Sequence, residues 1–261
     1  MKIDYEFANR LQLEIVYGAH VELDEKWQRK QVSDAYTRLY FVQSGEGYLR
    51  FDGGEIKLEP GFMYLIPAGF RFDYGCSRLE KLYFHIMLTA VEGIDLLSAL
   101  PCICKVPIAE HEQVDLMRWC NSNDYSDLLQ LKHCLYQRIG ECLRLPGMPS
   151  IPVRRHSALI IRAIDYIRDN IRVNLRVKEI AQALFVSESK LRKDFREETG
   201  MSLGKYIDNM IFLKAKQMLA DPALTIGQIS QRLGFCDQFY FSRRFKENFQ
   251  QTPSEYREEI R

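Results

Sequence analysis

The sequence contains no run of about 18 apolar residues, the length that a helix needs to cross a membrane. Its first residues, Met1-Lys-Ile-Asp-Tyr-Glu, lack the apolar core of a secretory signal peptide. The seven cysteines are odd in number and have no paired Cys-x-x-Cys spacing, which is typical of a reducing compartment. These absences favour a cytoplasmic protein with no membrane partner.

The apolar content is sufficient for folding, since 46% of the 261 residues are hydrophobic and the length suits two domains. The net charge of +1 hides a split between the two halves. Residues 151–261 hold 20 Lys and Arg against 14 Asp and Glu, a net charge of +6, whereas residues 1–150 hold 16 against 21, a net charge of −5. A basic half joined to an acidic half indicates that the C-terminal half meets a polyanion such as nucleic acid.

One pattern occurs twice in the C-terminal half, with an offset of 49 to 50 residues. In each copy, apolar residues spaced by three or four positions predict a short helix. A tight turn follows, and a capping residue, Ser187 or Asp237, begins a second helix. This is the pattern of a helix-turn-helix, whose second helix enters the major groove of DNA. The corresponding positions are Ile180, Ala181, Leu184, Val186, Ser187, Leu191, Phe195, Gly200, Ser202 and Tyr206 in the first copy and Ile229, Ser230, Leu233, Phe235, Asp237, Phe241, Phe245, Gln250, Thr252 and Tyr256 in the second.

Residues 203–220 join the two copies and have mostly helical spacing of apolar side chains, up to Asp221-Pro222, which ends a helix. A rigid helix here would hold the two recognition helices for successive major grooves on one face of DNA, roughly 34 Å apart. A further helix is expected from Leu159 to Ile171, with an apolar face against the first helix-turn-helix.

Four segments closely resemble the signature of the AraC/XylS family of bacterial transcription regulators. They are Leu213-Lys-Ala-Lys-Gln-Met-Leu219, Ile229-Ser-Gln-Arg-Leu-Gly-Phe235, Phe239-Tyr-Phe-Ser-Arg-Arg-Phe-Lys246 and Thr252-Pro-Ser-Glu-Tyr-Arg257. Two positions depart from it: Gln250 stands where members usually have Gly, and Ile211 where they often have a basic residue. The resemblance implies a homodimer that binds double-stranded promoter DNA and acts on RNA polymerase, more often as an activator.

Short apolar segments separated by Gly and Pro follow one another from residue 36 to residue 87. This spacing predicts short strands in an all-β barrel or a double-sheet jelly roll. The order Gly45-x-Gly47, Pro60-Gly61 and Pro67-x-Gly69 resembles the cupin barrel that often precedes the DNA-binding half in this family. We therefore expect a cupin-like effector-binding barrel over residues 1–90.

The metal site of enzymatic cupins uses a His-x-His pair, a Glu and a later His. Here Arg38-x-Tyr40 and Phe72 occupy the histidine positions, so no metal or other cofactor is expected. The barrel is predicted to bind a small molecule through a mainly aromatic pocket with a few polar groups. The candidate effector-binding residues, by strand position, are Arg38, Tyr40, Tyr64, Tyr74, Tyr83 and His85. The alternative for each tyrosine is ordinary core packing, and for His85 a hydrogen-bonded core or rim position. The family resemblance suggests a sugar as the effector, whereas Arg38 would equally suit an organic acid.

Residues 91–145 are predicted to form a helical connector. It contains an apolar stripe spaced by three or four positions: Leu128, Leu131, Leu135, Ile139 and Cys142. Either the barrel of the same chain or the same helix of a second copy must cover this stripe, and the family resemblance favours the second copy. Residues 146–153 contain three prolines and are the predicted linker. The predicted DNA-binding domain covers residues 154–261 and begins with the basic segment Arg154-Arg155-His156.

The outward positions of the two recognition helices are the candidate DNA contacts. The resemblance places base contacts of the first helix at Ser189, Arg192 and Lys193. Arg192 suits guanine because a guanidinium can donate hydrogen bonds to O6 and N7 of that base at once, which contributes about 1–3 kcal/mol of discrimination against a wrong base. In the second helix, Gln238 suits adenine and Tyr240 a thymine methyl group. The full set is Ser189, Arg192, Lys193, Arg196, Gln238, Phe239, Tyr240, Arg243, Arg244 and Lys246. For Arg244 and Lys246, the alternative is a solvated surface or an interaction with the helix dipole.

These patterns predict a multidomain protein, with an N-terminal all-β cupin-like barrel, a helical connector and a C-terminal all-α domain with two helix-turn-helix motifs. The favoured function is transcription activation that responds to a sugar or organic acid. Two alternatives are a cupin-type metalloenzyme with an accessory DNA-binding domain, and a ligand-independent regulator whose barrel only dimerises.

Overall fold

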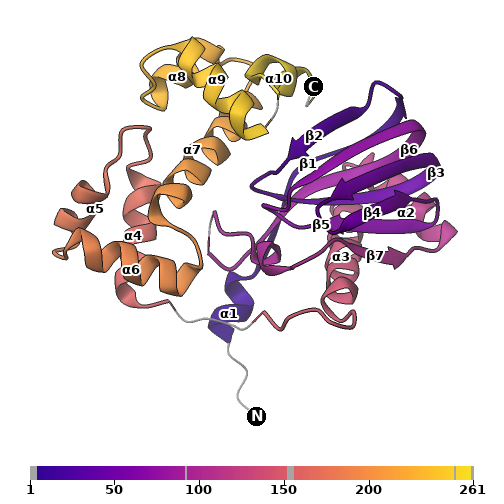
Figure 1. Ribbon diagram of the computed structural model, residues 1–261, viewed down its shortest axis with the longest axis horizontal. Helices are drawn as coiled ribbons and strands as arrows, with labels where there is room; N and C mark the ends of the chain where they lie inside the picture. Colours follow the sequence, from indigo (N-terminus) through magenta and orange to yellow (C-terminus); the bar gives the residue numbers. More distant parts are fainter. Residues whose placement is uncertain (1–4, 92, 152–155, 250, 260–261) are drawn as a thin grey trace. The chain divides into compact units, whose positions relative to one another are not determined.

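The computed structural model describes residues 5–91, 93–151, 156–249 and 251–259. The chain forms two compact units: unit 1 comprises Met1–Ala90 and Asp95–Ile151, and unit 2 comprises Val91–Ile94 and Pro152–Arg261. Figure 1 shows that unit 1 contains a sheet with helices, and that helices build unit 2. Residues 152–153 of the predicted linker, Arg154, Arg155 and Gln250 lie outside the described residues.

Unit 1 is built on an antiparallel sheet of seven described strands. The strand order is β1-β6-β3-β5-β7, while β2 pairs with β6 and β4 pairs with β3. The two longest strands, β3 and β6, pair from Thr37 opposite Ile86 to Arg50 opposite Asp73. The predicted all-β N-terminal domain is therefore confirmed as an antiparallel sheet. The strands are β1 Gln12–Asp24, β2 Gln28–Val32, β3 Thr37–Phe51, β4 Gly54–Leu58, β5 Phe62–Ile66, β6 Phe72–Thr89 and β7 Cys104–Pro107.

The Gly45-x-Gly47 motif lies where the pairing of β3 with β6 is irregular, with register shifts after Val42 and after Glu46. Gly45 has a φ of 82°, and a Cβ atom there would collide with the carbonyl group of Arg78. A side chain at this position would therefore both strain the backbone and push β6 away.

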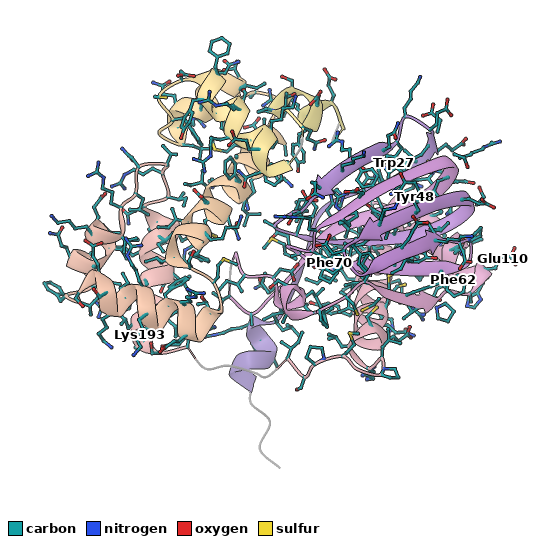
Figure 2. The ribbon with its side chains drawn as sticks, in the orientation of Figure 1. Trp27, Tyr48, Phe62, Phe70, Glu110 and Lys193 are labelled. Atoms are coloured by element: carbon teal, nitrogen blue, oxygen red, sulfur yellow. The ribbon has the colours of Figure 1, made fainter. Side chains whose placement is uncertain are left out.

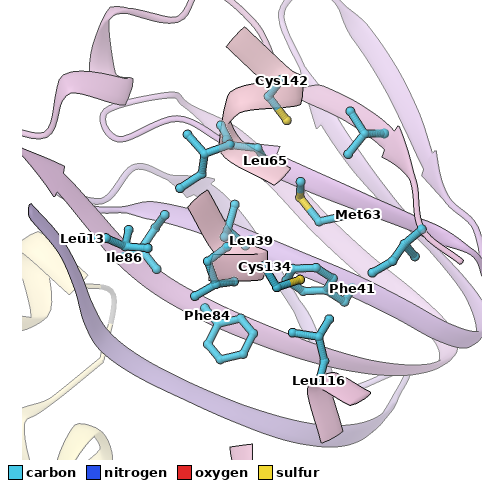
Figure 3. Packing of buried hydrophobic residues seen from close by; sticks show 14 of the residues in the cluster. Leu13, Leu39, Phe41, Met63, Leu65, Phe84, Ile86, Leu116, Cys134 and Cys142 are labelled. Atoms are coloured by element: carbon cyan, nitrogen blue, oxygen red, sulfur yellow. The ribbon is translucent and has the colours of Figure 1, made fainter. Parts of the chain in front are cut away.

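The two faces of the sheet pack against different material because side chains alternate along each strand. On β3, Leu39 and Phe41 belong to one buried cluster, shown in part in Figure 3, whereas Tyr40 and Val42 belong to another. The first cluster is mainly aliphatic, and the second is rich in tyrosine. The tyrosine-rich cluster places polar groups inside the sheet unit.

Helices α2 (Glu110–Cys120) and α3 (Tyr125–Leu143) cover the aliphatic face. The buried residues Leu131, Leu135, Ile139 and Cys142 of α3 pack in the same cluster as the sheet residues Leu39 and Phe84. Each fully buried Leu or Ile contributes about 1.5–3 kcal/mol. The preference for a second copy as the cover of this stripe is therefore wrong, because the stripe is used within the chain.

Unit 2 carries the two predicted helix-turn-helix motifs, which Figure 1 shows at opposite ends of α7. Phe195 of α6 packs on Tyr206 of α7 with ring centres 5.2 Å apart, and Phe212 of α7 lies 6.2 Å from Phe245 of α9. Helix α7 therefore shares its core with both motifs, and the spacer helix predicted over residues 203–220 is observed at Leu203–Leu219. The helices are α4 Ala158–Asp169, α5 Val177–Ala183, α6 Glu188–Thr199, α7 Leu203–Leu219, α8 Ile226–Arg232, α9 Gln238–Phe249 and α10 Pro253–Glu259; unit 1 adds α1 Tyr5–Arg10 and the 3₁₀ turn η1 Leu96–Ala99.

Candidate nucleic-acid interface and interior polar site

The two helix-turn-helix motifs repeat the same backbone hydrogen bonds. In the first, Val186 N donates to Ala181 O at 3.0 Å, and in the second, Phe235 N donates to Ser230 O at 3.0 Å. These bonds fix the tight turn between the two helices of each motif. The duplication predicted from the sequence is therefore also a duplication of structure.

A polar side chain caps the start of each recognition helix. Ser187 Oγ accepts a hydrogen bond from Lys190 N at 3.2 Å, and Asp237 Oδ1 accepts one from Tyr240 N at 2.7 Å. The bond from Tyr240 N holds the pKa of Asp237 below its usual range, so this cap stays ionised at neutral pH. Such caps satisfy backbone N–H groups that have no partner within the helix.

On α6, the inward residues Leu191 and Phe195 are fully buried. The four predicted contact residues Ser189, Arg192, Lys193 and Arg196 are all exposed, and Lys193 is labelled in Figure 2. Arg192 lies 3.4 Å from Glu188, and Lys193 lies 3.9 Å from Glu197. Because both pairs are exposed, they are weak and leave these cations available to another anion.

On α9, Gln238, Phe239, Arg243 and Lys246 are exposed, and Phe239 has 84% of its surface accessible. Tyr240 is half-buried against Phe235, with ring centres 5.9 Å apart. Four of the predicted residues of this helix are thus on its surface, while Tyr240 contributes to packing as well.

Arg244 differs from the other predicted contact residues because its guanidinium is engaged inside unit 2. It donates to Asp208 of α7 at 3.3 Å and to the Tyr240 hydroxyl at 3.3 Å, and it lies 5.8 Å from the Phe212 ring centre. Its side chain is only 25% exposed. These contacts join α9 to α7 and give Arg244 a structural role that the sequence did not indicate.

The two recognition helices differ in charge. Helix α6 carries four basic and four acidic residues, whereas α9 carries three basic residues and one acidic residue. A helix with excess positive charge attracts phosphate more strongly. We therefore expect α9 to supply the larger share of the electrostatic attraction.

In unit 1, the tyrosine-rich face of the sheet holds a buried ion pair. Arg38 Nε donates to Asp34 Oδ2 at 2.9 Å, a second Arg38 nitrogen also donates to that oxygen, and Arg38 Nη1 donates to the Tyr40 hydroxyl at 2.9 Å. Burial raises the pKa of Tyr40 to about 12, although Arg38 opposes this effect. The Tyr40 hydroxyl therefore stays protonated and can donate a hydrogen bond.

Most of the predicted effector residues form a connected group around this pair. The Arg38 guanidinium lies 6.0 Å from the Tyr74 ring centre. Tyr40 and Tyr83 have ring centres 6.4 Å apart, and Tyr83 lies 5.1 Å from His85. Tyr64 is different, since its hydroxyl donates to Lys57 O and accepts from Glu59 N, both at 2.9 Å. Its hydroxyl is thus used between strands, which fits the core-packing alternative.

The structure adds interior residues that were not predicted from the sequence. Lys81 is 2% exposed, and its ammonium lies 3.3 Å from the Tyr40 ring centre and 3.8 Å from that of Trp27. Trp27 stacks on Tyr74 at 4.3 Å and is labelled in Figure 2. The alternation Lys81-x-Tyr83-x-His85 on one strand was the available signal, because it places all three side chains on one face.

Two further observations concern the described residues. Among them, no group of three or more His, Cys, Asp or Glu residues is arranged to hold a metal ion. Likewise, none of the helices in that part of the chain combines the length and the apolar character needed to span a bilayer.

Comparison with known proteins gives consistent matches. A family model described as a helix-turn-helix domain matches residues 180–259. The Msm operon regulatory protein of Streptococcus mutans is 40% identical over 241 residues, covering 88% of this chain and 86% of that protein. The arabinose operon regulatory protein of Escherichia coli is 31% identical over 231 residues, covering 82% of this chain and 77% of that protein.

Among solved structures, ToxT from Vibrio cholerae has a similar fold. One ToxT structure matches with a TM-score of 0.64 at 16% identity, covering 94% of this chain and 98% of that chain. Another ToxT structure contains a bound unsaturated fatty acid. At this low identity the likeness concerns the fold alone.

Proposed function

This chain belongs to the AraC/XylS family of transcription regulators, and we propose that it activates transcription when its N-terminal unit binds a sugar. As a family member, it is a DNA-binding regulator with an N-terminal sheet domain and a C-terminal helix-turn-helix domain. The sign of regulation, the effector and its site are the proposed parts. Activity of this kind takes place in the cytoplasm, where promoter DNA lies.

The observation that carries the DNA-binding role is the repeated capped recognition helix. Both helices begin at a capping side chain, bury an apolar face and expose polar or basic residues on the other. Two such helices at the ends of α7, itself about 25 Å long, suit successive major grooves. Arg192 and Gln238 are the proposed principal base contacts.

The effector site is proposed to be the tyrosine-rich face of unit 1. The proposal is supported by a group of side chains in which polar atoms lie close together between aromatic rings: Arg38, Tyr40, Tyr74, Tyr83 and His85. A sugar is favoured because a relative regulates the arabinose operon. The fatty acid in ToxT makes a carboxylate the competing ligand.

Effector binding is proposed to change how a homodimer presents its recognition helices to promoter half-sites and to RNA polymerase. The face of α3 that the sheet leaves uncovered supports a dimer contact. Tyr125 is 85% exposed and Leu129 is 67% exposed, and their spacing of four residues places them on one side of the helix. The activity is binding and needs no catalytic group; metal content of the purified protein tests the metalloenzyme alternative.

Selection of DNA fragments from a random pool by the full-length protein tests the proposed function. We expect an enriched sequence with two protected segments about one helical turn apart. Adding the correct sugar should change the affinity for the enriched fragment or transcription from it in a purified system. A pool from which no sequence is enriched would refute sequence-specific binding. Enrichment without any response to sugars would favour the ligand-independent regulator.

A further inference from the structure

One carboxylate oxygen inside unit 1 has no hydrogen-bond partner among the described residues. Asp34 is 6% exposed, and its Oδ2 accepts both hydrogen bonds from Arg38. Its Oδ1 is buried and accepts none. A buried acceptor without a donor is unfavourable, so a donor that reached Oδ1 would be bound preferentially.

The neighbouring Arg38 has donors to spare. A guanidinium has five N–H groups, and Arg38 directs three of them to Asp34 and the Tyr40 hydroxyl. The other two have no acceptor among the residues that the structure describes. Rings surround the guanidinium, with the centres of Tyr36 at 5.8 Å and Phe72 at 5.7 Å. Unused donors and an unused acceptor therefore lie together in an aromatic surrounding.

We infer that Asp34 accepts a hydrogen bond from an effector hydroxyl, and that this contact selects a neutral polyhydroxylated ligand over a carboxylate. The inference rests on the proposed function and concerns the same site. A sugar hydroxyl can donate to Asp34 Oδ1 and accept from an Arg38 N–H group. A carboxylate has only acceptors, and the negative charge of Asp34 repels it.

Charge and shape support the same ligand class. The positive charge of Arg38 is already balanced by Asp34, so this pair offers no net charge to an anion. Aromatic rings line the site, among them the half-buried Trp27, which stacks on Tyr74, and flat rings of this kind suit the C–H face of a sugar. Lys81 is the opposing feature, because its buried ammonium would attract an acid. Acidic ligands therefore belong in the test.

The test measures binding to the full-length protein by calorimetry and by shifts in melting temperature. The ligands are neutral mono- and disaccharides, the matching uronic and aldonic acids, and a long-chain fatty acid. We expect a neutral sugar to bind wild-type protein, and Asp34→Asn to lower its affinity at least about tenfold, the value of one hydrogen bond to a charged group. Glu55→Gln is the matched control, because Glu55 pairs with Arg50 on the exposed surface of the same unit. It should leave the affinity unchanged.

A second arm uses wild-type protein and so does not depend on the folding of Asp34→Asn. Replacing single hydroxyls of the bound sugar by fluorine removes the donor but keeps the size, and one such analogue should lose at least about tenfold in affinity. Equal affinity of a neutral sugar for wild-type and Asp34→Asn, or tolerance of fluorine at every position, overturns the role of Asp34. Binding of only the acids overturns the ligand class. If no ligand of the panel binds, the proposed effector site itself is wrong.

Discussion

At the scale of single residues, the turn of the first helix-turn-helix holds a strained phenylalanine. Phe185 has a φ of 57° where the second motif has Gly234, with a φ of 77°. Phe185 is 92% exposed, so its side chain buries little. Because the left-handed backbone costs an L-residue about 1–2 kcal/mol, Phe185→Gly should raise the free energy of unfolding of unit 2 by up to about 1 kcal/mol after the entropy of glycine is subtracted. Denaturant unfolding measures this, with Gly234→Ala as the opposite change. A loss of stability in Phe185→Gly would show that Phe185 makes a contact.

The raised pKa of the buried Asp95 carboxyl group should make the stability of unit 1 depend on pH. Asp95 accepts hydrogen bonds from Thr37 N, Thr37 Oγ1, Leu88 N and Leu97 N, but burial outweighs them and raises its pKa from 3.8 to about 6. A carboxyl group with a higher pKa in the folded chain binds its proton more tightly there. The free energy of unfolding should therefore fall by up to about 3 kcal/mol as pH rises from about 4 to about 6 and change little above that.

The comparison of wild type with Asp95→Asn isolates this effect. The variant should lose the pH dependence between about 4 and 6 while other carboxyl groups contribute equally to both proteins. It should also be less stable at pH 7, by about 1–3 kcal/mol, because the amide nitrogen of asparagine is a donor and would replace an oxygen that accepts hydrogen bonds from N–H groups. Urea titrations across this pH range measure both changes. Identical slopes for the two proteins would contradict the raised pKa.

Individual interior residues were harder to predict from the sequence than the residues of the recognition helices. Helical spacing separates Leu191 from Arg192 without knowledge of the rest of the chain. Asp34 precedes β3 and meets Arg38 only through the shape of the loop, which no local pattern encodes. Trp27 joins the same face because β2 pairs with β6, a contact far apart in sequence.

At the scale of elements, α3 is predicted to stabilise unit 1 through its buried face and to serve association through its exposed face. Leu135 is fully buried and Leu129 is 67% exposed on the same helix. Leu135→Ala should cost about 2–5 kcal/mol of stability. Leu129→Ala should change stability little and instead weaken self-association, as measured by analytical ultracentrifugation. If Leu135→Ala left stability unchanged, the packing of α3 on the sheet would be wrong.

Two arginines of the recognition helices should behave differently because one is exposed and the other packs inside unit 2. Arg192 is exposed, so Arg192→Ala should cost about 1–3 kcal/mol of discrimination between the selected site and a random one. Arg244 joins α9 to Asp208 of α7, so Arg244→Ala should lower the stability of unit 2 by about 1–2 kcal/mol. Titrations with specific and random DNA, paired with unfolding curves, separate the two effects. If Arg192→Ala lowered stability and Arg244→Ala lowered only the discrimination between DNA sites, the roles assigned to the two arginines would be wrong.

Elements with local signals were predicted well, and those that depend on distant packing were not. The caps Ser187 and Asp237 and the ends of α7 followed from neighbouring residues. The apolar stripe of α3 was recognised, but not its cover, because spacing alone does not distinguish a sheet of the same chain from a helix of another.

At the scale of the whole molecule, charge is segregated along the chain. Residues 151–261 have a net charge of +6 and residues 1–150 one of −5. A net positive domain neutralises phosphates and releases their counterions, so affinity should fall steeply with salt, with a logarithmic slope of about −0.9 per phosphate contact. The acidic N-terminal half should contribute nothing to this slope.

Replacing Lys246 tests the salt dependence of DNA binding quantitatively. Lys246 is exposed on α9, the helix with excess positive charge. If it contacts a phosphate, Lys246→Ala should weaken binding to specific and random DNA by the same factor and reduce the magnitude of the salt slope by about 1. Lys105→Ala is the control, because Lys105 is a comparable cation of unit 1 that pairs with Glu59; its slope should equal that of wild type. An unchanged slope in Lys246→Ala would place this lysine away from the DNA backbone, and an altered slope in Lys105→Ala would show that unit 1 also contacts the duplex.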